Sequence, residues 1–112
     1  MIVFLHGLES TVDEHLQPVG RKVQWLRPRY PGVVTPGLDT RAAIALKDHC
    51  VATGAGWFDD ADRLAAAFQR PMAHARAAIT DDTTLVIGSS FGGAVLLKLL
   101  CEGGWSGPSI FL

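Results

Sequence analysis

Four short runs along the chain consist of apolar or β-branched residues with little polar alternation. They cover residues 2–5, 33–35, 83–87 and 109–112. Continuous runs of this kind are typical of strands in a parallel sheet, because helices cover both faces of such a sheet. We therefore expect four strands, the second of them closed by Pro36 and Gly37.

The intervening segments predict helices. We place them at residues 19–26, 40–48, 59–80 and 94–101. The first and third carry apolar residues three and four positions apart, and the fourth is apolar almost throughout. Pro28 and Pro31 should end the first helix, since proline removes a backbone hydrogen bond. Asp39 or Thr40 suits the N-cap of the second helix, and Pro71 should kink the third or divide it.

The alternation of strands and helices predicts an α/β fold. The expected architecture is a parallel sheet with right-handed crossovers and helices on both faces. The chain has 112 residues, which corresponds to one domain spanning 1–112. Residues 8–19 are expected to form a loop. The segment 38–58 follows this pattern least clearly, and we expect it to be irregular or to shape a pocket.

Composition narrows the class of function. The formal net charge is −1 and the isoelectric point about 6.4, which argues against a nucleic-acid partner. No apolar run approaches the roughly 18 residues of a membrane span, and the N-terminus lacks the features of a signal peptide. Cys50 and Cys101 have no metal-ligand spacing and form no disulfide framework. We therefore expect a cytoplasmic protein with no membrane partner, no metal and no organic cofactor.

The strongest chemical signal is the sequence Gly88-Ser89-Ser90-Phe91-Gly92. It has the pattern G-x-S-x-G between a predicted strand and a predicted helix, which is the setting of a nucleophilic serine. Glycine at positions 88 and 92 removes side chains that would collide in so sharp a turn. We expect the turn to expose the Ser90 hydroxyl at a helix N-terminus, where free N–H groups stabilise an oxyanion. Ser89 should point elsewhere.

A second signal follows the first predicted strand. His6, Gly7 and Leu8 should emerge at the same carboxyl edge of the parallel sheet as the serine turn. Gly7 permits close approach of the backbone, so the N–H of Leu8 can join that of Phe91 in an oxyanion hole. We interpret His6 as a structural residue that hydrogen-bonds neighbouring loops, not as the catalytic base.

With these motifs the chain resembles the α/β-hydrolase superfamily. The matching segments are FLHG at 4–7, VVTP at 33–36, VIGSSFGG at 86–93 and SIFL at 109–112. The sequences HGLES at 6–10 and GRK at 20–22 are similar to a branch of small esterases. The resemblance implies an α/β-hydrolase-type sheet, incomplete at the C-terminus, and a hydrolase of carboxylic esters or thioesters that forms an acyl-enzyme on Ser90.

The resemblance also implies that an acid and a histidine follow the serine along the chain. Glu102 is the single acid after Ser90, and no histidine follows it. We therefore expect the acid and the histidine beyond Leu112, in a hydrolase roughly twice as long as this chain. His15, His49 and His74 precede the serine and are expected at the surface.

Several alternatives stay open at this point. The chain can be a non-catalytic hydrolase fragment that binds a partner, or a second copy of itself, through an open sheet edge. The same fold can also host another acyl-transfer reaction. Two further options are weak. Residues 88–93 lack the spacing and lysine of a phosphate-binding loop, and His49 with Cys50 is a poor nucleophile pair. Asp59, Asp60 and Asp62 are expected to cap a helix.

Overall fold

The computed structural model describes residues 1–8 and 13–112. Seven elements follow one another: β1 (Ile2–Leu5), α1 (Arg21–Arg29), α2 (Arg41–Thr53), α3 (Ala61–Ala78), β2 (Leu85–Gly88), α4 (Phe91–Glu102) and β3 (Ser109–Phe111). Part of the expected 8–19 loop, residues 9–12, lies outside the described residues, as do the last two residues of the HGLES match. The expected α/β class is confirmed.

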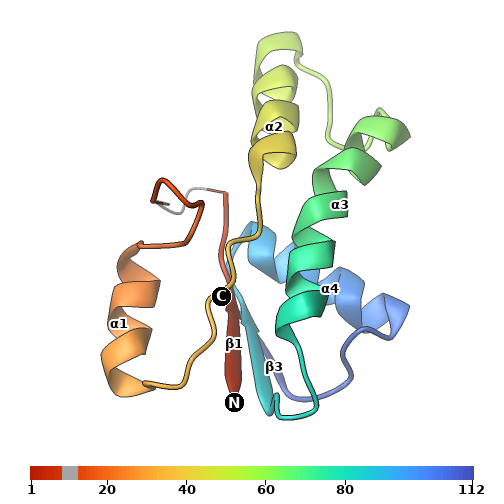
Figure 1. Ribbon diagram of the computed structural model, residues 1–112. Helices are drawn as coiled ribbons and strands as arrows, with labels where there is room; N and C mark the ends of the chain where they lie inside the picture. The colour runs from red at the N-terminus through yellow and green to blue at the C-terminus, as the bar shows by residue number, and fades with distance from the viewer. Residues whose placement is uncertain (9–12) are drawn as a thin grey trace.

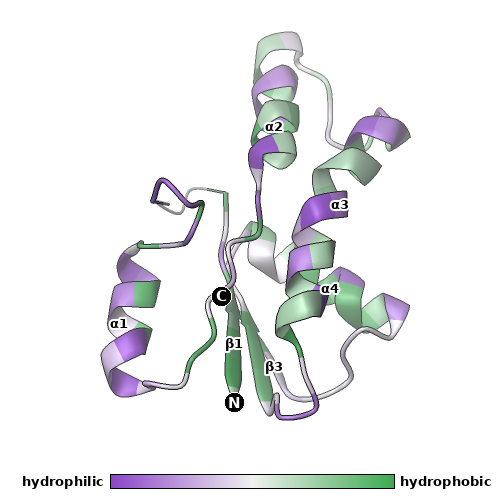
Figure 2. Cartoon of the chain, viewed as in Figure 1, coloured by the Kyte–Doolittle hydropathy of each residue, from purple (hydrophilic) through white to green (hydrophobic). Residues whose placement is uncertain are grey.

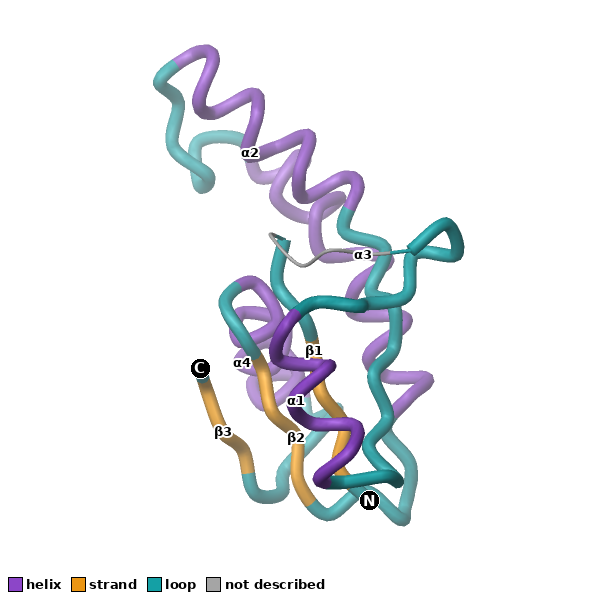
Figure 3. Tube along the Cα trace, turned by 90° about the vertical axis from the view of Figure 1, so that its left-hand side faces the viewer, coloured by secondary structure: helices purple, strands orange, loops and turns teal. Residues whose placement is uncertain are grey.

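The sheet is parallel and its strands lie in the order β1-β2-β3 (Figure 3). Phe4 lies opposite Ile87, and Ile87 lies opposite Ile110. Three of the four expected strands therefore form. Consecutive strands are parallel, so all their carboxyl ends meet at one edge of the sheet.

The strand expected at residues 33–35 is reduced to a single bridge beside β1. Val34 pairs with Val3, through hydrogen bonds of 2.8 Å from Val34 N–H to the Ile2 carbonyl and from Phe4 N–H to the Val34 carbonyl. Pro36 follows closely and has no N–H to continue the ladder, which explains why the pairing stops here. The bridge still carries the chain along the outer side of β1 towards the carboxyl edge.

Helices lie on both faces of the sheet, as expected (Figure 1). On one face, Val23 and Leu26 of α1 pack against Phe4 and Ile87. On the other face, α4 packs on β1 and β2, and α3 packs on α4. A larger cluster of buried residues fills that side, including Val86, Val95, Leu96 and Leu99.

Figure 2 shows that the strands are the most uniformly apolar elements. β1 and β2 are largely buried, as expected for strands covered on both faces. The expectation is wrong for β3, whose Ile110 and Phe111 are exposed because β3 is the edge strand.

The expectation that Pro28 ends its helix is wrong, and of the two outcomes expected for Pro71, a kink or a division of the helix, the division does not occur. Pro28 lies inside α1 and does not end it, because a proline removes one backbone bond and the helix is already in its last turn there. The N–H of Tyr30 closes that turn on the Leu26 carbonyl at 2.8 Å. Pro71 lies inside α3, which is one helix of 18 residues and is not divided. Its ring is buried, so packing compensates for the lost bond.

The segment 38–58 contains more regular structure than its sequence indicates. The helix expected at 40–48 extends to Thr53, and Gly54 ends it in the left-handed conformation with φ 72°. Thr40 occupies the N-cap position without a side-chain cap bond. The helix expected at 94–101 begins earlier, at Phe91, which places its N-terminus directly after the serine turn. In residues 1–8 and 13–112, no helix combines the length and hydropathy that a bilayer span requires.

Candidate active site

Ser90 occupies a strained turn between β2 and α4. Its backbone has φ 54° and ψ −118°, a conformation that costs a residue other than glycine about 1–3 kcal/mol. Ser90 is exposed, whereas the neighbouring Ser89 is 5% exposed. The turn thus presents one of two adjacent hydroxyl groups to solvent.

Two glycines allow this turn to pack on the sheet. A Cβ atom on Gly88 would lie 2.6 Å from the carbonyl oxygen of Gly92. A Cβ atom on Gly92 would collide with the carbonyl oxygen of Leu5, at the end of β1. The glycine positions of the G-x-S-x-G pattern are therefore dictated by backbone contacts, within the turn and across to the neighbouring strand.

The loop after β1 reaches the same turn. The N–H of Ser89 donates to the Leu5 carbonyl at 3.0 Å, and a Cβ atom on Gly7 would lie 2.9 Å from the Cβ of Ser90. Among the described residues, the N–H groups of Leu8 and Phe91 have no hydrogen-bond partner. Phe91 begins α4, so its N–H belongs to the positive end of the helix dipole. The loop after β1 and the start of α4 thus each contribute one amide donor that has no partner among the described residues.

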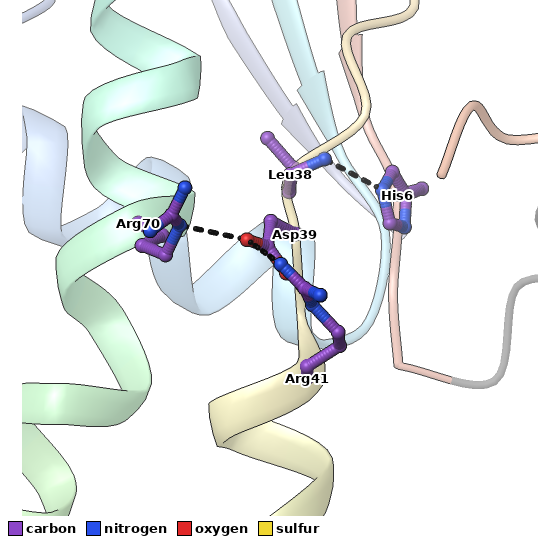
Figure 4. Close-up of polar contacts among 5 residues, drawn as sticks. All are labelled: His6, Leu38, Asp39, Arg41 and Arg70. Atoms are coloured by element: carbon purple, nitrogen blue, oxygen red, sulfur yellow. Dashed lines mark hydrogen bonds and ion pairs between the residues drawn. The ribbon is translucent and has the colours of Figure 1, made fainter. Parts of the chain in front are cut away.

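His6 joins this loop to the segment before α2 (Figure 4). Its ring is 1% exposed. Nε2 accepts a hydrogen bond of 3.0 Å from the N–H of Leu38, so the proton of the neutral ring is on Nδ1, which donates to the Gly7 carbonyl at 2.9 Å. Burial lowers the pKa of His6, which favours this neutral form. Both ring nitrogens are therefore committed to backbone groups.

Asp39 holds the next residues in place with two ion pairs (Figure 4). Its carboxylate, 6% exposed, accepts from Nε of Arg41 at 2.7 Å and from Nε of Arg70 at 2.7 Å. The hydrogen bond from Arg41 is the main cause that lowers the pKa of Asp39 to about 2. Of the two residues expected as the N-cap of α2, Thr40 holds that position, and Asp39 instead links α2 to α3. Sequence reasoning missed this link, because Arg70 is far away along the chain.

A cavity of about 350 Å³ opens beside Ser90. Its wall is formed by Leu8, Trp57, Phe58, Leu64, Phe68 and Phe91. The ring of Phe68 meets that of Phe91 edge-on, with centroids 4.9 Å apart, and Trp57 lies 6.5 Å from Phe91. Trp57 and Phe58, at the end of segment 38–58, both line this cavity.

The remaining acids and histidines of the described residues make no hydrogen bond to Ser90. His15 and His74 are exposed, and His49 is half-buried. Glu102 binds Arg76 of α3 and Lys98 of α4. The described residues therefore bring a serine and two amide donors together, without a general base.

The three aspartates at the start of α3 behave as structural residues. Asp60 is the N-cap, and its carboxylate accepts from the N–H groups of Asp62 and Arg63 at 3.1 Å. Asp59 accepts from the N–H of Gly56 at 2.8 Å. Within residues 1–8 and 13–112, no cluster of His, Cys, Asp and Glu side chains suits a metal ion.

The fold and this site define an α/β protein with an exposed serine at a strand-to-helix turn. No protein-family model, no curated protein and no solved structure matches the chain. The functional argument therefore rests on the geometry of the site.

Proposed function

We propose that the chain carries the nucleophile and oxyanion hole of a serine hydrolase that cleaves carboxylic esters or thioesters. The observation that carries this proposal is the strained, exposed conformation of Ser90, with φ 54° and ψ −118°, beside the amides of Leu8 and Phe91, which have no partner among the described residues. Strain of this kind persists only where the surrounding structure enforces it, and it clusters at functional sites. An α/β-hydrolase relationship agrees with the same turn.

The reaction proceeds through an acyl-enzyme. The Ser90 oxygen forms a bond to the acyl carbon while a general base takes the hydroxyl proton. The N–H groups of Leu8 and Phe91 donate to the oxyanion of the tetrahedral intermediate. The intermediate collapses as the bond to the leaving alcohol or thiol breaks and the base returns the proton to it. Water then attacks the acyl-enzyme by the reverse sequence, which releases the acid and restores Ser90.

In this proposal the general base and its orienting acid follow residue 112 in a longer protein. His6 is unsuited to the role, because both of its ring nitrogens are already bonded to backbone groups. Cys50 and Cys101 are free, which supports a cytoplasmic location. The substrate is a small molecule, and no metal or organic cofactor takes part.

A second candidate is a non-catalytic binding module. The observation that favours it is the lack of a base next to Ser90 among the described residues. An apolar groove of about 590 Å³, which includes Trp25, Ile87 and Ile110 in its wall, would then serve for binding near the open edge strand β3. Under this alternative the Ser90 hydroxyl has no chemical role.

Chemical rescue distinguishes the two candidates. The purified chain is incubated with p-nitrophenyl acetate and increasing imidazole, which supplies a diffusible general base. The hydrolase proposal predicts p-nitrophenol release above the imidazole background, lost in Ser90→Ala and retained in Ser89→Ala, since Ser89 is the buried neighbour. Equal rates for the unmodified chain and Ser90→Ala, with both folded, would favour the binding module.

A further inference from the structure

The cavity beside Ser90 is chemically selective. Among the described residues that line it, none carries an acidic or basic side chain, and the polar side-chain groups are the Ser90 hydroxyl and the indole N–H of Trp57. A charged group would lose hydration there without gaining a partner of opposite charge. An apolar group gains by leaving water. The cavity therefore favours an uncharged hydrocarbon group, aliphatic or aromatic.

The cavity also lies next to the position that the acyl carbon of a substrate would occupy when Ser90 attacks it. Residues 8 and 91 contribute both the free amides and part of the cavity wall. A carbonyl oxygen held by these amides, with its carbon next to the Ser90 oxygen, therefore places one substituent of that carbon in the cavity. We propose that this substituent is the acyl chain, and that it is apolar, uncharged and short to medium in length. The inference rests on the proposed function of Ser90.

The acyl chain fits this position better than the leaving group does. The acyl chain stays bonded to Ser90 through both half-reactions, so a cavity that holds it contributes to each step. The leaving group must depart before water enters, so it gains nothing from an apolar cavity after the first half-reaction. The leaving group therefore lies towards solvent.

The volume of the cavity limits how much of the acyl chain it can cover. The cavity measures about 350 Å³ and is open to solvent on one side, so its wall covers a chain on the order of ten non-hydrogen atoms. This volume is near the lower end of ligand pockets, which span about 300–1,000 Å³. Acyl chains of up to about ten carbons should fit, and longer chains should gain little.

The ring of Phe68 closes the inner end of the cavity beside Ser90. The same ring also lines a second cavity of about 530 Å³ between α3 and α4, which contains Arg76, Lys98 and Glu102. Phe68 is held between the ring of Phe91, at 4.9 Å, and the ammonium group of Lys98, 6.0 Å from its centroid. It thus separates the apolar cavity from a charged one. Replacing Phe68 with alanine would join the two cavities.

Binding of saturated carboxylates tests this inference without catalysis. Acetate, hexanoate, octanoate and dodecanoate are titrated into the ¹⁵N-labelled chain, and the amide signals of Leu8 and Phe91 are followed by NMR. Each added methylene should tighten binding roughly threefold to fourfold up to about ten carbons. 1-Octanol, which lacks the carboxylate, should move the Trp57 signals and shift the amides of Leu8 and Phe91 much less than octanoate does.

Two variants of α3 supply the matched comparison. Leu64→Trp fills the cavity and should weaken octanoate binding at least tenfold more than it weakens acetate binding. Ala65→Trp adds the same bulk to an exposed neighbour outside the cavity wall and should bind octanoate like the unmodified chain. Phe68→Ala should raise the affinity for dodecanoate above that for octanoate.

Different results would overturn the acyl-chain assignment and the hydrolase proposal. Octanoate that binds no tighter than acetate, or that binds equally to the Leu64→Trp and Ala65→Trp variants, would overturn the acyl-chain assignment. Octanol that moves the Leu8 and Phe91 amides as octanoate does would also overturn it. Reactivity of Ser90 is read separately in the imidazole assay, so intact octanoate binding with an inert serine would count against the hydrolase proposal alone.

Discussion

Gly7 and Ser90 approach so closely that a Cβ atom on Gly7 would lie 2.9 Å from the Cβ of Ser90 and 3.1 Å from the Ser89 carbonyl oxygen. The two residues come from opposite ends of the chain, yet they bring the loop after β1 against the serine turn. This contact brings the residue next to Leu8 directly against Ser90. The candidate oxyanion hole depends on it.

Gly7→Ala should therefore weaken the oxyanion hole. The methyl group displaces the 7–8 loop from Ser90, and loss of one oxyanion donor lowers the rate by about 10²–10³-fold. The measurement is imidazole-dependent hydrolysis of p-nitrophenyl acetate, normalised to folded protein by circular dichroism. Gly32→Ala is the control, because nothing lies within 4 Å of the added methyl group. Equal rates for the two variants would contradict this account of the loop.

Strain at Ser90 predicts an unusual order of stability. Ser90→Gly relieves a conformation with φ 54°, whereas Ser90→Ala retains it, so the glycine variant should be more stable by about 1 kcal/mol. Urea unfolding followed by circular dichroism measures the difference. Ser106 is exposed and has no positive φ, and there the alanine variant should be the more stable of the pair. A Ser90 pair that behaves like the Ser106 pair would disprove the strain.

Two adjacent glycines at the start of α4 should respond in opposite ways. Gly92→Ala forces a methyl group into the Leu5 carbonyl and should destabilise the fold by several kcal/mol, on the order of 3. Gly93→Ala meets its nearest atoms at 3.5 Å and should be neutral or stabilising by up to about 1 kcal/mol, since alanine favours helix. Thermal unfolding of both variants measures this difference in stability. Equal stabilities would show that the turn does not pack on β1.

The ion pairs of Asp39 predict a loss of stability in acid. Its pKa is lowered from 3.8 to about 2 in the folded chain, so the unfolded chain binds a proton first as the pH falls. The contribution is complete above about pH 4 and disappears towards pH 2. Since Arg41 and Arg70 are 70% and 67% exposed, we expect about 1–2 kcal/mol.

Asp39→Asn should remove that acid-dependent part and lower the unfolding free energy at neutral pH. Asp48→Asn, at an exposed position on α2, is the matched control and should keep the pH profile of the unmodified chain. Urea unfolding between pH 2 and 7 gives both profiles. Parallel profiles for Asp39→Asn and the unmodified chain would show that the carboxylate does not link α2 to α3.

His6 predicts a second pH dependence, at higher pH. Burial lowers its pKa below 6.5, so the unfolded chain binds a proton before the folded chain does, and stability falls as the pH drops below about 6.5. Protonation would also place a hydrogen on Nε2, where Leu38 N–H donates. His6→Gln should flatten the profile between pH 7 and 5, and His74→Gln, at an exposed site, should not.

The turn at Ser90 was predictable because its determinants are local. Glycines two positions before and after the serine, a strand run before them and an apolar helix after them all lie within a few residues. A full strand was expected at 33–35, but an apolar run does not reveal how many backbone hydrogen bonds the neighbouring strand can form with it. In the structure, Val34 forms a single parallel bridge with Val3.

Features that join distant segments were not predictable from local patterns. The ion pair of Asp39 with Arg70 joins residues 31 positions apart along the chain, and nothing near Asp39 indicates it. The cavity wall combines Leu8, Trp57, Phe68 and Phe91, which come from four separate segments. Trp57 on its own indicates only an apolar side chain that needs burial.

Covalent labelling tests the central claim, the nucleophilic role of Ser90, most directly. The chain is treated with a fluorophosphonate in the presence of imidazole, digested and mapped by tandem mass spectrometry, with Ser90→Ala and Ser89→Ala in parallel. We predict one adduct, located on Ser90, absent from Ser90→Ala and retained in Ser89→Ala. An adduct located on Ser89, or a folded chain that stays unlabelled, would contradict the assignment of Ser90 as the nucleophile.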